Sequence, residues 1–431
     1  MSTVSIRAAG SSGVLGSDAL GALLWVAVVV PPSFGFWLVA GDLAGVPAGD
    51  ERTLILSSLL ALGFATLVQV LAGYRMPIFE GPASTYLGAV AVLAAGAGGT
   101  HPAQVTAGLL AAGVFVFLLG IFNFDRVLLR IFRPAVVVSF VLIVAIAVAP
   151  DTIERAIGRD GSHSWGSSAA WISSAVVVAC AVGGRRIAPL RSFGLLIGLV
   201  AGTLCYFLLA GFPSQAIESS WALPTLFPWG APDFSAAAVI PFLIAGVLAS
   251  LNLMASIDAV AVATGDRPAV ATTRRAIACH GGSQAVAACF GNVLGNVPRL
   301  DSAAVVRMIG NPRPRALAIA AAAIFALAFL SPVVDLLSRI PISVSAAVLG
   351  VVLAMLAEQG LRQMKGFEWW RRWLVVVPAV APTFAWLIFA DRLSEQLQLV
   401  ANPLLIGVVL AVVLDRLVPR LLAGQARGAI G

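Results

Sequence analysis

Long apolar stretches follow one another along the whole chain, and each is separated from the next by glycine, proline or charged residues. Most approach the ~20 residues that a helix needs to cross the hydrocarbon core of a bilayer. The pattern predicts an all-α polytopic membrane protein with fourteen transmembrane segments. These segments lie at residues 20–40, 54–73, 77–97, 105–122, 134–150, 169–183, 193–212, 236–263, 276–290, 297–309, 316–331, 341–358, 373–389 and 399–418.

Positive charges alternate between the two sides of this predicted bundle. If the N-terminus is cytoplasmic, 21 of the 27 lysine and arginine residues fall in inner loops and 6 in outer loops. Cytoplasmic loops of membrane proteins carry such an excess. The charges therefore predict a multi-pass protein of the plasma (cell inner) membrane with both termini in the cytoplasm.

Composition narrows the class further. Hydrophobic residues make up 60% of the chain and charged residues 11%, with a mean hydropathy of +0.98, whereas soluble domains carry about 25% charged residues. The net charge of +7 lies in loops rather than in a basic tail, so no nucleic-acid partner is expected. The four cysteines are isolated, and the sequence contains no P-loop, HExxH or GxSxG motif. We therefore expect no metal site, no cofactor and no enzymatic activity.

Two segments are interrupted by glycine and proline. The third contains "FEGPAS" and the tenth follows "FGNVLGNVPRLDS", so each is third in its own set of seven. Paired interrupted segments in two inverted halves are the best sequence pointer to the substrate site of a transporter. The predicted organisation is a 7+7 inverted repeat, with a cytoplasmic N-terminal segment, a first repeat, an extracytoplasmic linker, a second repeat and a cytoplasmic tail, at residues 1–19, 20–212, 213–235, 236–418 and 419–431.

Five stretches carry a resemblance to a known family. They are "MPIFEGPASTY", "RPAVVVSFVLIVAIAVAP", "WALPTLFPWGAPDFSAAAVIPFLI", "FGNVLGNVPRLDSAAVV" and "SRIPISVSAAVLGVVLAMLAEQGLR". Over residues 20–418 the chain resembles the nucleobase/ascorbate transporter family, the uracil and xanthine permeases. The resemblance implies a core domain of segments 1–4 and 8–11, a gate domain of segments 5–7 and 12–14, and short strands in segments 3 and 10 beside the substrate.

The chain also departs from that family at three site positions. Ala249, followed by Ser250, stands where the family usually carries a glutamate, and Ser84 stands near the position of its usual aromatic residue. In the tenth segment only Asp301, followed by Ser302, keeps the family's acidic character. By this resemblance we expect these residues to lie at the substrate site.

Glu80 is an acid at predicted membrane depth, where ionisable residues are costly and by default functional. Gly81 permits close approach of the backbone, and the amides around Ala83, Ser84 and Thr85 could point at a ligand from the start of a half-helix. Glu80 is therefore a candidate for substrate binding and for proton coupling. The alternative is that it pairs with Arg75 or Arg299 and only braces the fold.

Further candidates surround the tenth and eighth segments. Asp301 is either a helix cap or a proton-coupling acid, and Arg299 either binds an anion at the half-helix or neutralises a nearby acid. Asp258 is the third candidate for proton coupling. For Asn252, hydrogen bonding between helices is the preferred interpretation. Ordinary polar roles are expected for the histidines, including His280 near the edge of the ninth segment.

The resemblance and the paired interruptions together predict a secondary active transporter. Its substrate would be a small planar heterocycle, a nucleobase such as uracil or xanthine, taken up by proton symport with an elevator-type mechanism. The expected partners are that small molecule, a proton or sodium ion, the lipid bilayer and a second copy of the chain in a homodimer. The alternatives are an anion carrier for a sulfate-like or bicarbonate-like ion, an aromatic carboxylate carrier and, more remotely, a channel.

Overall fold

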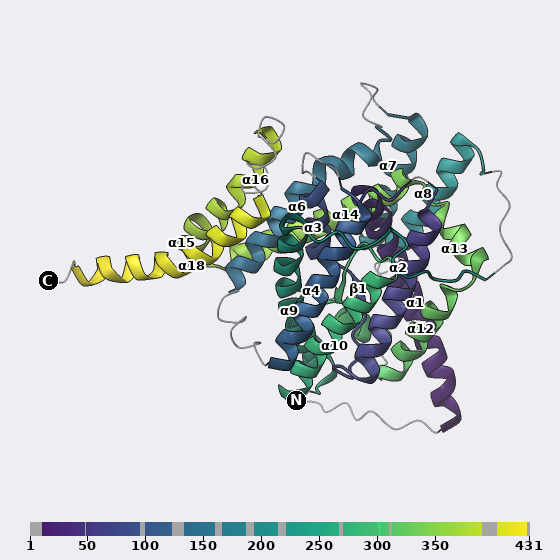
Figure 1. The fold of residues 1–431 in the computed structure, drawn as a ribbon, viewed down its shortest axis with the longest axis horizontal. Coiled ribbons are helices and arrows are strands. Elements are labelled where there is room, and N and C mark those ends of the chain that lie inside the picture. Colours follow the sequence, from purple (N-terminus) through teal and green to yellow (C-terminus); the bar gives the residue numbers. More distant parts are fainter. Residues whose placement is uncertain are drawn as a thin grey trace.

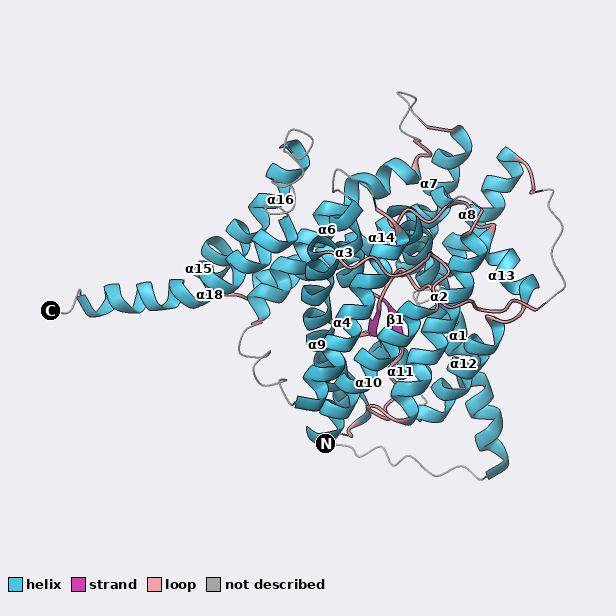
Figure 2. Ribbon diagram, viewed as in Figure 1, coloured by secondary structure: helices cyan, strands magenta, loops and turns pink. Residues whose placement is uncertain are grey.

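A computed structural model of the chain describes residues 11–47, 49–94, 100–122, 133–159, 166–186, 194–213, 221–266, 270–300, 302–309, 313–389 and 403–428. Helices dominate these residues, and one pair of short strands lies among them (Figures 1 and 2). Seven of the described helices are long and apolar enough to cross a membrane, judged by length and composition. The prediction of an all-helical membrane protein is confirmed at this level.

The elements of the first part of the chain follow the predicted segments. Segment 3 is a strand followed by a short helix, as expected. The elements are α1 (Ser11–Leu43), α2 (Glu51–Leu71), β1 (Glu80–Pro82), α3 (Ser84–Ala94), α4 (Pro102–Phe122), α6 (Pro134–Ala156), α7 (Ser168–Arg186) and α8 (Gly194–Ala210).

The second part repeats the strand and short helix in segment 10. It adds one unpredicted short helix, α13, between segments 11 and 12, and a π-helical turn, η2, in segment 13. The elements are α9 (Ala236–Thr264), α10 (Val270–Cys289), β2 (Asn296–Pro298), α11 (Ser302–Ile309), α12 (Pro314–Leu327), α13 (Ser331–Ser338), α14 (Ile342–Lys365), α15 (Trp369–Arg371), η2 (Arg372–Val376), α16 (Val377–Phe389) and α18 (Pro403–Gly428).

The helices pack as two bundles. The first contains α1, α2, α3, α4, α9, α10, α11 and α12, and the second contains α6, α7, α8, α14, α16 and α18. The bundles meet where α1 packs on α14 and α3 packs on α6. The far end of α18 projects from the body of the molecule (Figure 1). The strand pair belongs to the first bundle, because β1 packs on α1 and α2 and β2 packs on α9.

Helices α4 and α10 approach closely along a face of small residues. A Cβ atom on Gly113 would lie 2.6 Å from the amide nitrogen of Ala285, and one on Gly120 would lie 2.4 Å from that of Ala278. From the other side, a Cβ on Gly281 would lie 2.5 Å from the carbonyl oxygen of Gly113. Small residues let the backbones of membrane helices come close enough for strong van der Waals contact. This face holds α10 firmly against its neighbour.

Gly281→Leu should therefore destabilise the protein. The added side chain has backbone rather than flexible side-chain atoms in its path, and overpacking of this kind costs about 3 kcal/mol. The adjacent Gly282→Leu is the matched control, because a Cβ there would meet only the Phe117 ring, at 3.5 Å. Thermal unfolding in detergent measures both variants. An equal loss of stability in the two would contradict this account of the helix contact.

Candidate functional site

The two strands form an antiparallel pair in the middle of the first bundle. Glu80 lies opposite Pro298, and Gly81 lies opposite Val297. The amide of Ala83 extends the ladder by donating to the Gly295 carbonyl at 3.1 Å. Short helices follow each strand, α3 from residue 84 and α11 from residue 302. Each interrupted segment thus forms a strand and a half-helix, as the sequence predicts.

Neighbouring helices satisfy the polar backbone of the strands. Asn252 Nδ2 and Ser256 Oγ, one turn apart on α9, both donate to the Pro298 carbonyl at 2.9 Å. On α2, Thr66 Oγ1 accepts from the Glu80 amide at 3.1 Å. Non-helical backbone at membrane depth is tolerated only where such partners replace water. The interpretation preferred for Asn252, a hydrogen bond between helices, is wrong in its partner, because Asn252 bonds the backbone of strand β2.

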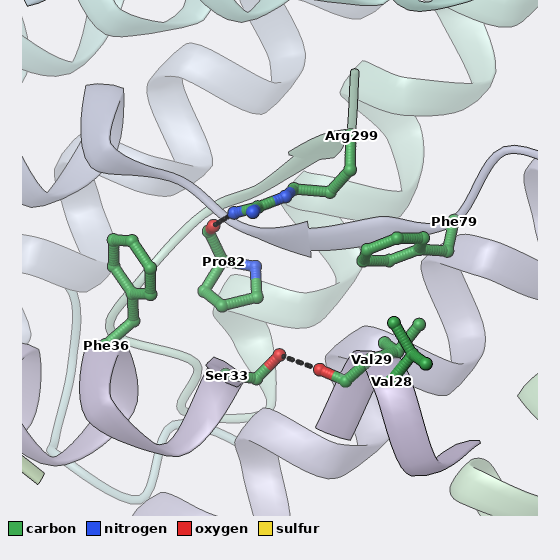
Figure 3. Close-up of a pocket in the computed structure, with 7 residues that line it drawn as sticks. All are labelled: Val28, Val29, Ser33, Phe36, Phe79, Pro82 and Arg299. Carbon is green, nitrogen blue, oxygen red and sulfur yellow. Dashed lines mark hydrogen bonds between the residues drawn. The ribbon is translucent and has the colours of Figure 1, made fainter. Parts of the chain in front are cut away.

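A small pocket lies between the strands and α1 (Figure 3). Water-sized molecules can occupy only about 20 Å³ of it, room for about one water molecule, so the pocket is narrow in this conformation. In Figure 3 the rings of Phe36 and Phe79 lie on opposite sides of the space, and Arg299 lies above Pro82. The lining residues are Val28, Val29, Ser33 and Phe36 from α1, Phe79 and Pro82 around β1, and Arg299 after β2.

Arg299 supplies the polar edge of this pocket. Its Nη1 donates to the Pro82 carbonyl at 3.4 Å, and its guanidinium carbon lies 6.0 Å from the centroid of the Phe79 ring. A guanidinium is planar, carries only donors and matches pairs of oxygen acceptors. With apolar and aromatic walls around it, the pocket suits a small flat ligand that presents oxygen atoms at one edge.

Glu80 faces away from this pocket. Its Oε2 lies 3.3 Å from Nδ1 of His280 on α10, and both side chains are buried, with exposed fractions of 0% and 1%. Pairing with Arg75 or Arg299, the alternative considered for Glu80, is therefore wrong, because its partner is a histidine. Arg75 instead donates from Nε to the Leu71 carbonyl at 3.2 Å.

Other predicted site residues are packed beside the strands without lining the pocket. Ala249 and Ser250 are fully buried, and the Ser250 hydroxyl donates to the Gly246 carbonyl one turn earlier. Ser302 Oγ accepts from the Phe79 amide at 3.3 Å. The Thr85 hydroxyl is buried without a hydrogen-bond partner among the described residues. Their roles in substrate binding stay predictions.

Three predicted positions fall elsewhere. Asp258 lies on an exposed part of α9, two turns before the helix ends, and its proton-coupling role stays a prediction. Asp301 lies outside the described residues, as does the side chain of Ser84. Within the described residues, no group of three or more His, Cys, Asp or Glu side chains could hold a metal ion.

His280 and Gln284 are site residues that the sequence interpretation missed. His280 was expected near a segment boundary, but α10 begins at Val270 and places it in the middle of the helix. The available signal was the spacing in "HGGSQ", which puts both side chains on one helix face. Polar residues four apart inside an apolar helix indicate a buried polar contact.

The fold is that of a class of multi-pass membrane transporters. It is similar to the transmembrane domain of a cyanobacterium bicarbonate transporter, BicA, with a TM-score of 0.66 and 15% identity over 90% of this chain and 97% of that chain. It is also similar to the murine anion transporter Slc26a9 in its inward-facing state, with a TM-score of 0.65 and 14% identity over 96% and 73% of the two chains. At these identities the likeness is one of fold.

The family follows from the sequence itself. Residues 16–380 match Xan_ur_permease, a permease family, and the chain belongs to it. This membership confirms the resemblance to uracil and xanthine permeases and makes the chain a transporter rather than an enzyme.

Individual relatives are more distant. The uric acid permease PucK of Bacillus subtilis is 30% identical over 54% of each chain, and the putative purine permease YwdJ of the same organism is 27% identical over 57% of this chain and 58% of its own. These alignments span little more than half of the relatives. The nucleobase transporter PlUacP of Paenibacillus larvae is 25% identical over 79% of this chain and 78% of its own.

Proposed function

We propose that the chain is a secondary active transporter that takes up a purine or pyrimidine base by proton symport. The observation that carries the proposal is the pocket beside the strand pair, with aromatic rings on two sides and a guanidinium at one edge. Offset stacking on Phe79 suits a flat heterocycle. Membership in a permease family, with relatives named for purines, uric acid, xanthine and uracil, supports the same class of substrate.

Within this class, Arg299 favours bases that carry several ring carbonyls. A guanidinium can only donate hydrogen bonds, so it complements the oxygens of an oxopurine such as xanthine or uric acid. It opposes the amino groups of adenine or cytosine, which would place donor against donor. The preferred order of substrates is therefore oxopurines and uracil before amino bases.

The proposed mechanism is of the elevator type. The first bundle, which holds the strand pair, moves past the second bundle and carries the pocket from one side of the membrane to the other. The two strand and half-helix units support a 7+7 inverted repeat, whose halves can exchange roles between the two end states. Both termini would lie in the cytoplasm, and a homodimer would form through the second bundle. Comparable energies of the end states are required for turnover.

The second candidate is an anion carrier, for a sulfate-like or bicarbonate-like ion or an aromatic carboxylate. Arg299 favours it, because a guanidinium also binds oxyanions bidentately. Uptake into proteoliposomes separates the candidates, with labelled xanthine, uric acid, uracil, sulfate, bicarbonate and benzoate tested with and without a pH gradient. Accumulation of a base that depends on the gradient supports the proposal, and accumulation of an anion alone refutes it.

Arg299→Gln should weaken binding of oxopurines. Loss of hydrogen bonds from a charged donor removes about 1.5–3 kcal/mol, and we therefore expect the concentration for half-maximal uptake to rise roughly tenfold or more. Arg362→Gln is the control, because Arg362 has an exposed fraction of 75% and pairs with Glu358 on the surface of α14. Thermal shift verifies that both variants are folded. Equal affinities of the folded Arg299→Gln variant and the wild type would contradict the assigned role.

A further inference from the structure

On the face of β1 that turns away from the pocket, the carboxyl group of Glu80 contacts the imidazole of His280. Glu80 Oε2 and His280 Nδ1 are 3.3 Å apart in the interior of the first bundle. The contact lacks the alignment of a hydrogen bond. Both carboxyl oxygens and both ring nitrogens are therefore buried without a hydrogen-bond partner among the described residues. Such groups are costly to bury unless they hold a proton or a ligand.

One face of α10 contacts both strands. His280 reaches β1 at Glu80, and Gln284, one turn further along, accepts from the Asn296 amide of β2 through Oε1 at 3.0 Å. Three further side-chain atoms at this contact between α10 and the strands are also buried without partners in the described part of the chain. They are Gln284 Nε2 and the side-chain atoms Nδ2 and Oδ1 of Asn296. The contact of Glu80 with His280 can therefore change charge, whereas the contact of Gln284 with Asn296 is neutral. Hydrogen-bond donors and acceptors without partners among the described residues lie beside both.

While they are buried, the Glu80 carboxyl group and the His280 imidazole together hold one proton, because only then is their net charge zero. With no proton the pair is a carboxylate beside a neutral imidazole and carries one negative charge, and with two protons it carries one positive charge. Burial of a net charge costs several kcal/mol, whereas a pair that holds a single proton is neutral overall, whichever residue carries it. The proton can therefore leave only when water reaches the pair to solvate the charge that remains.

The other polar groups around Glu80 are either neutral or engaged with backbone carbonyls. Tyr74, Tyr86 and Cys279 lie within electrostatic reach of the Glu80 carboxyl, and each is neutral in its ordinary protonated form. Arg275 of α10 donates to the Gly73 carbonyl from Nε and Nη2, at 3.3 and 3.2 Å. Arg299 lies on the opposite, pocket side of the strands. Among these groups, Glu80 and His280 are the two that meet between β1 and α10.

The strand pair connects this unit to the pocket. Phe79, the residue before β1, lines the pocket, and Gly81 points the same way, because a Cβ on it would lie 3.1 Å from both Phe79 Cε2 and Arg299 Cγ. Side chains alternate between the two faces of a strand, so a shift of β1 toward or away from α10 moves the pocket wall as well. Protonation and substrate binding can therefore influence each other without direct contact.

From this geometry we infer that Glu80 and His280 form the site that takes up one proton from the outer solution and releases it inside. The inference rests on the proposed transport function and names the proton site that it requires. The proton binds the carboxylate and imidazole pair when the first bundle is open to the outside, and it leaves to water when that bundle is open to the cytoplasm. No other bond forms or breaks.

Glu80→Gln and His280→Gln test the inference in proteoliposomes. In both we expect xanthine accumulation driven by an inward proton gradient to fall roughly tenfold, within the ~5–150-fold range of coupling between two sites. Exchange of labelled for unlabelled xanthine needs no net proton movement and should persist. His101→Gln, in the segment before α4, is the matched control and should keep its drive by the gradient. Gradient-driven accumulation that persists in both pair variants, or is lost in Asp258→Asn instead, would overturn the inference.

A second measurement does not depend on the substrate. Infrared difference spectra of the reconstituted full chain after a pH jump should show a carboxyl band that disappears in Glu80→Gln and shifts in His280→Gln. If the wild type moves none of the tested bases but shows this band, the proposed substrate fails and the proton site stands. If the wild type lacks any Glu80-dependent band, the proton site is refuted whatever the transport result.

Discussion

Gly81→Val should abolish transport while leaving the protein folded. A Cβ at this position already lies 3.1 Å from Phe79 Cε2 and 3.1 Å from Arg299 Cγ, and the two methyl groups of valine extend further into the narrow space that these two side chains line. The ring and the guanidinium stem would have to move out of the pocket. We expect uptake at low substrate concentration to fall roughly 100-fold, the factor that about 3 kcal/mol of overpacking gives.

The size series at this position separates occlusion from misfolding. Gly81→Ala adds one methyl group and should have a smaller effect than valine, because the neighbours need give only a few tenths of an ångström. The same crowding lowers folding stability, by up to about 3 kcal/mol, so thermal unfolding in detergent verifies that each variant is folded before its uptake is compared. Gly350→Val in α14 is the control, since a Cβ there would meet only Thr152, at 3.7 Å. Normal uptake by a folded Gly81→Val variant would show that the substrate binds elsewhere.

The helices could be predicted because the bilayer leaves the backbone few choices. An apolar run inside a membrane must satisfy its amides internally, and this selects helices wherever glycine and proline do not interfere. The interruptions were equally informative. Across the two strands Gly81 now pairs with Val297, Pro82 with Asn296, and Glu80 with Pro298. Two segments about 215 residues apart were matched by their position in the chain alone.

The apolar pattern did not predict the polar ends of helices or the shortest helices. Helix α10 begins six residues before the predicted apolar run, in "VATTRR", because a helix continues past the apolar window when its polar turns have hydrogen-bonding partners or solvent. Helix α13 holds Pro332 at its start and has only eight residues. Proline is well tolerated in a first turn, but a segment of this length carries no transmembrane signal.

The strand pair was predicted, but not the direction in which its side chains face. The residues assigned to the substrate as a group were Glu80, Gly81, Ala83, Ser84 and Thr85. Strand β1 instead turns Glu80 toward α10 and Gly81 toward Phe79 and Arg299. A three-residue strand gives no alternating pattern from which the facing side could be inferred. The pairing of Glu80 with His280, 200 residues away, is a tertiary contact that leaves no local signal. The pocket residues of α1 were missed for the same reason.

The second bundle contains a buried acid, Asp415. Removing this acid and removing its arginine partners should change the free energy of unfolding by very different amounts. Asp415 of α18 has an exposed fraction of 1%, and its two oxygens lie 3.4 Å from Arg133 Nη1 and 3.3 Å from Arg371 Nε. Arg133 precedes α6 and Arg371 ends α15, so the carboxylate joins three elements. The arginines have exposed fractions of 47% and 36%. They can therefore return to water, but the carboxylate cannot.

This asymmetry predicts an order of stabilities. Arg133→Gln combined with Arg371→Gln isolates a buried carboxylate and should lower the free energy of unfolding by about 3–5 kcal/mol. Asp415→Asn leaves only cations that can be rehydrated and should cost about 1 kcal/mol. The triple variant should then be more stable than the arginine double variant, because removing the stranded charge recovers most of the loss. Glu358→Gln, which breaks an exposed pair with Arg362, is the control and should change stability by less than about 1 kcal/mol. Thermal unfolding in detergent ranks the four. A triple variant less stable than the double would mean that Asp415 stabilises the bundle through packing rather than through its charge.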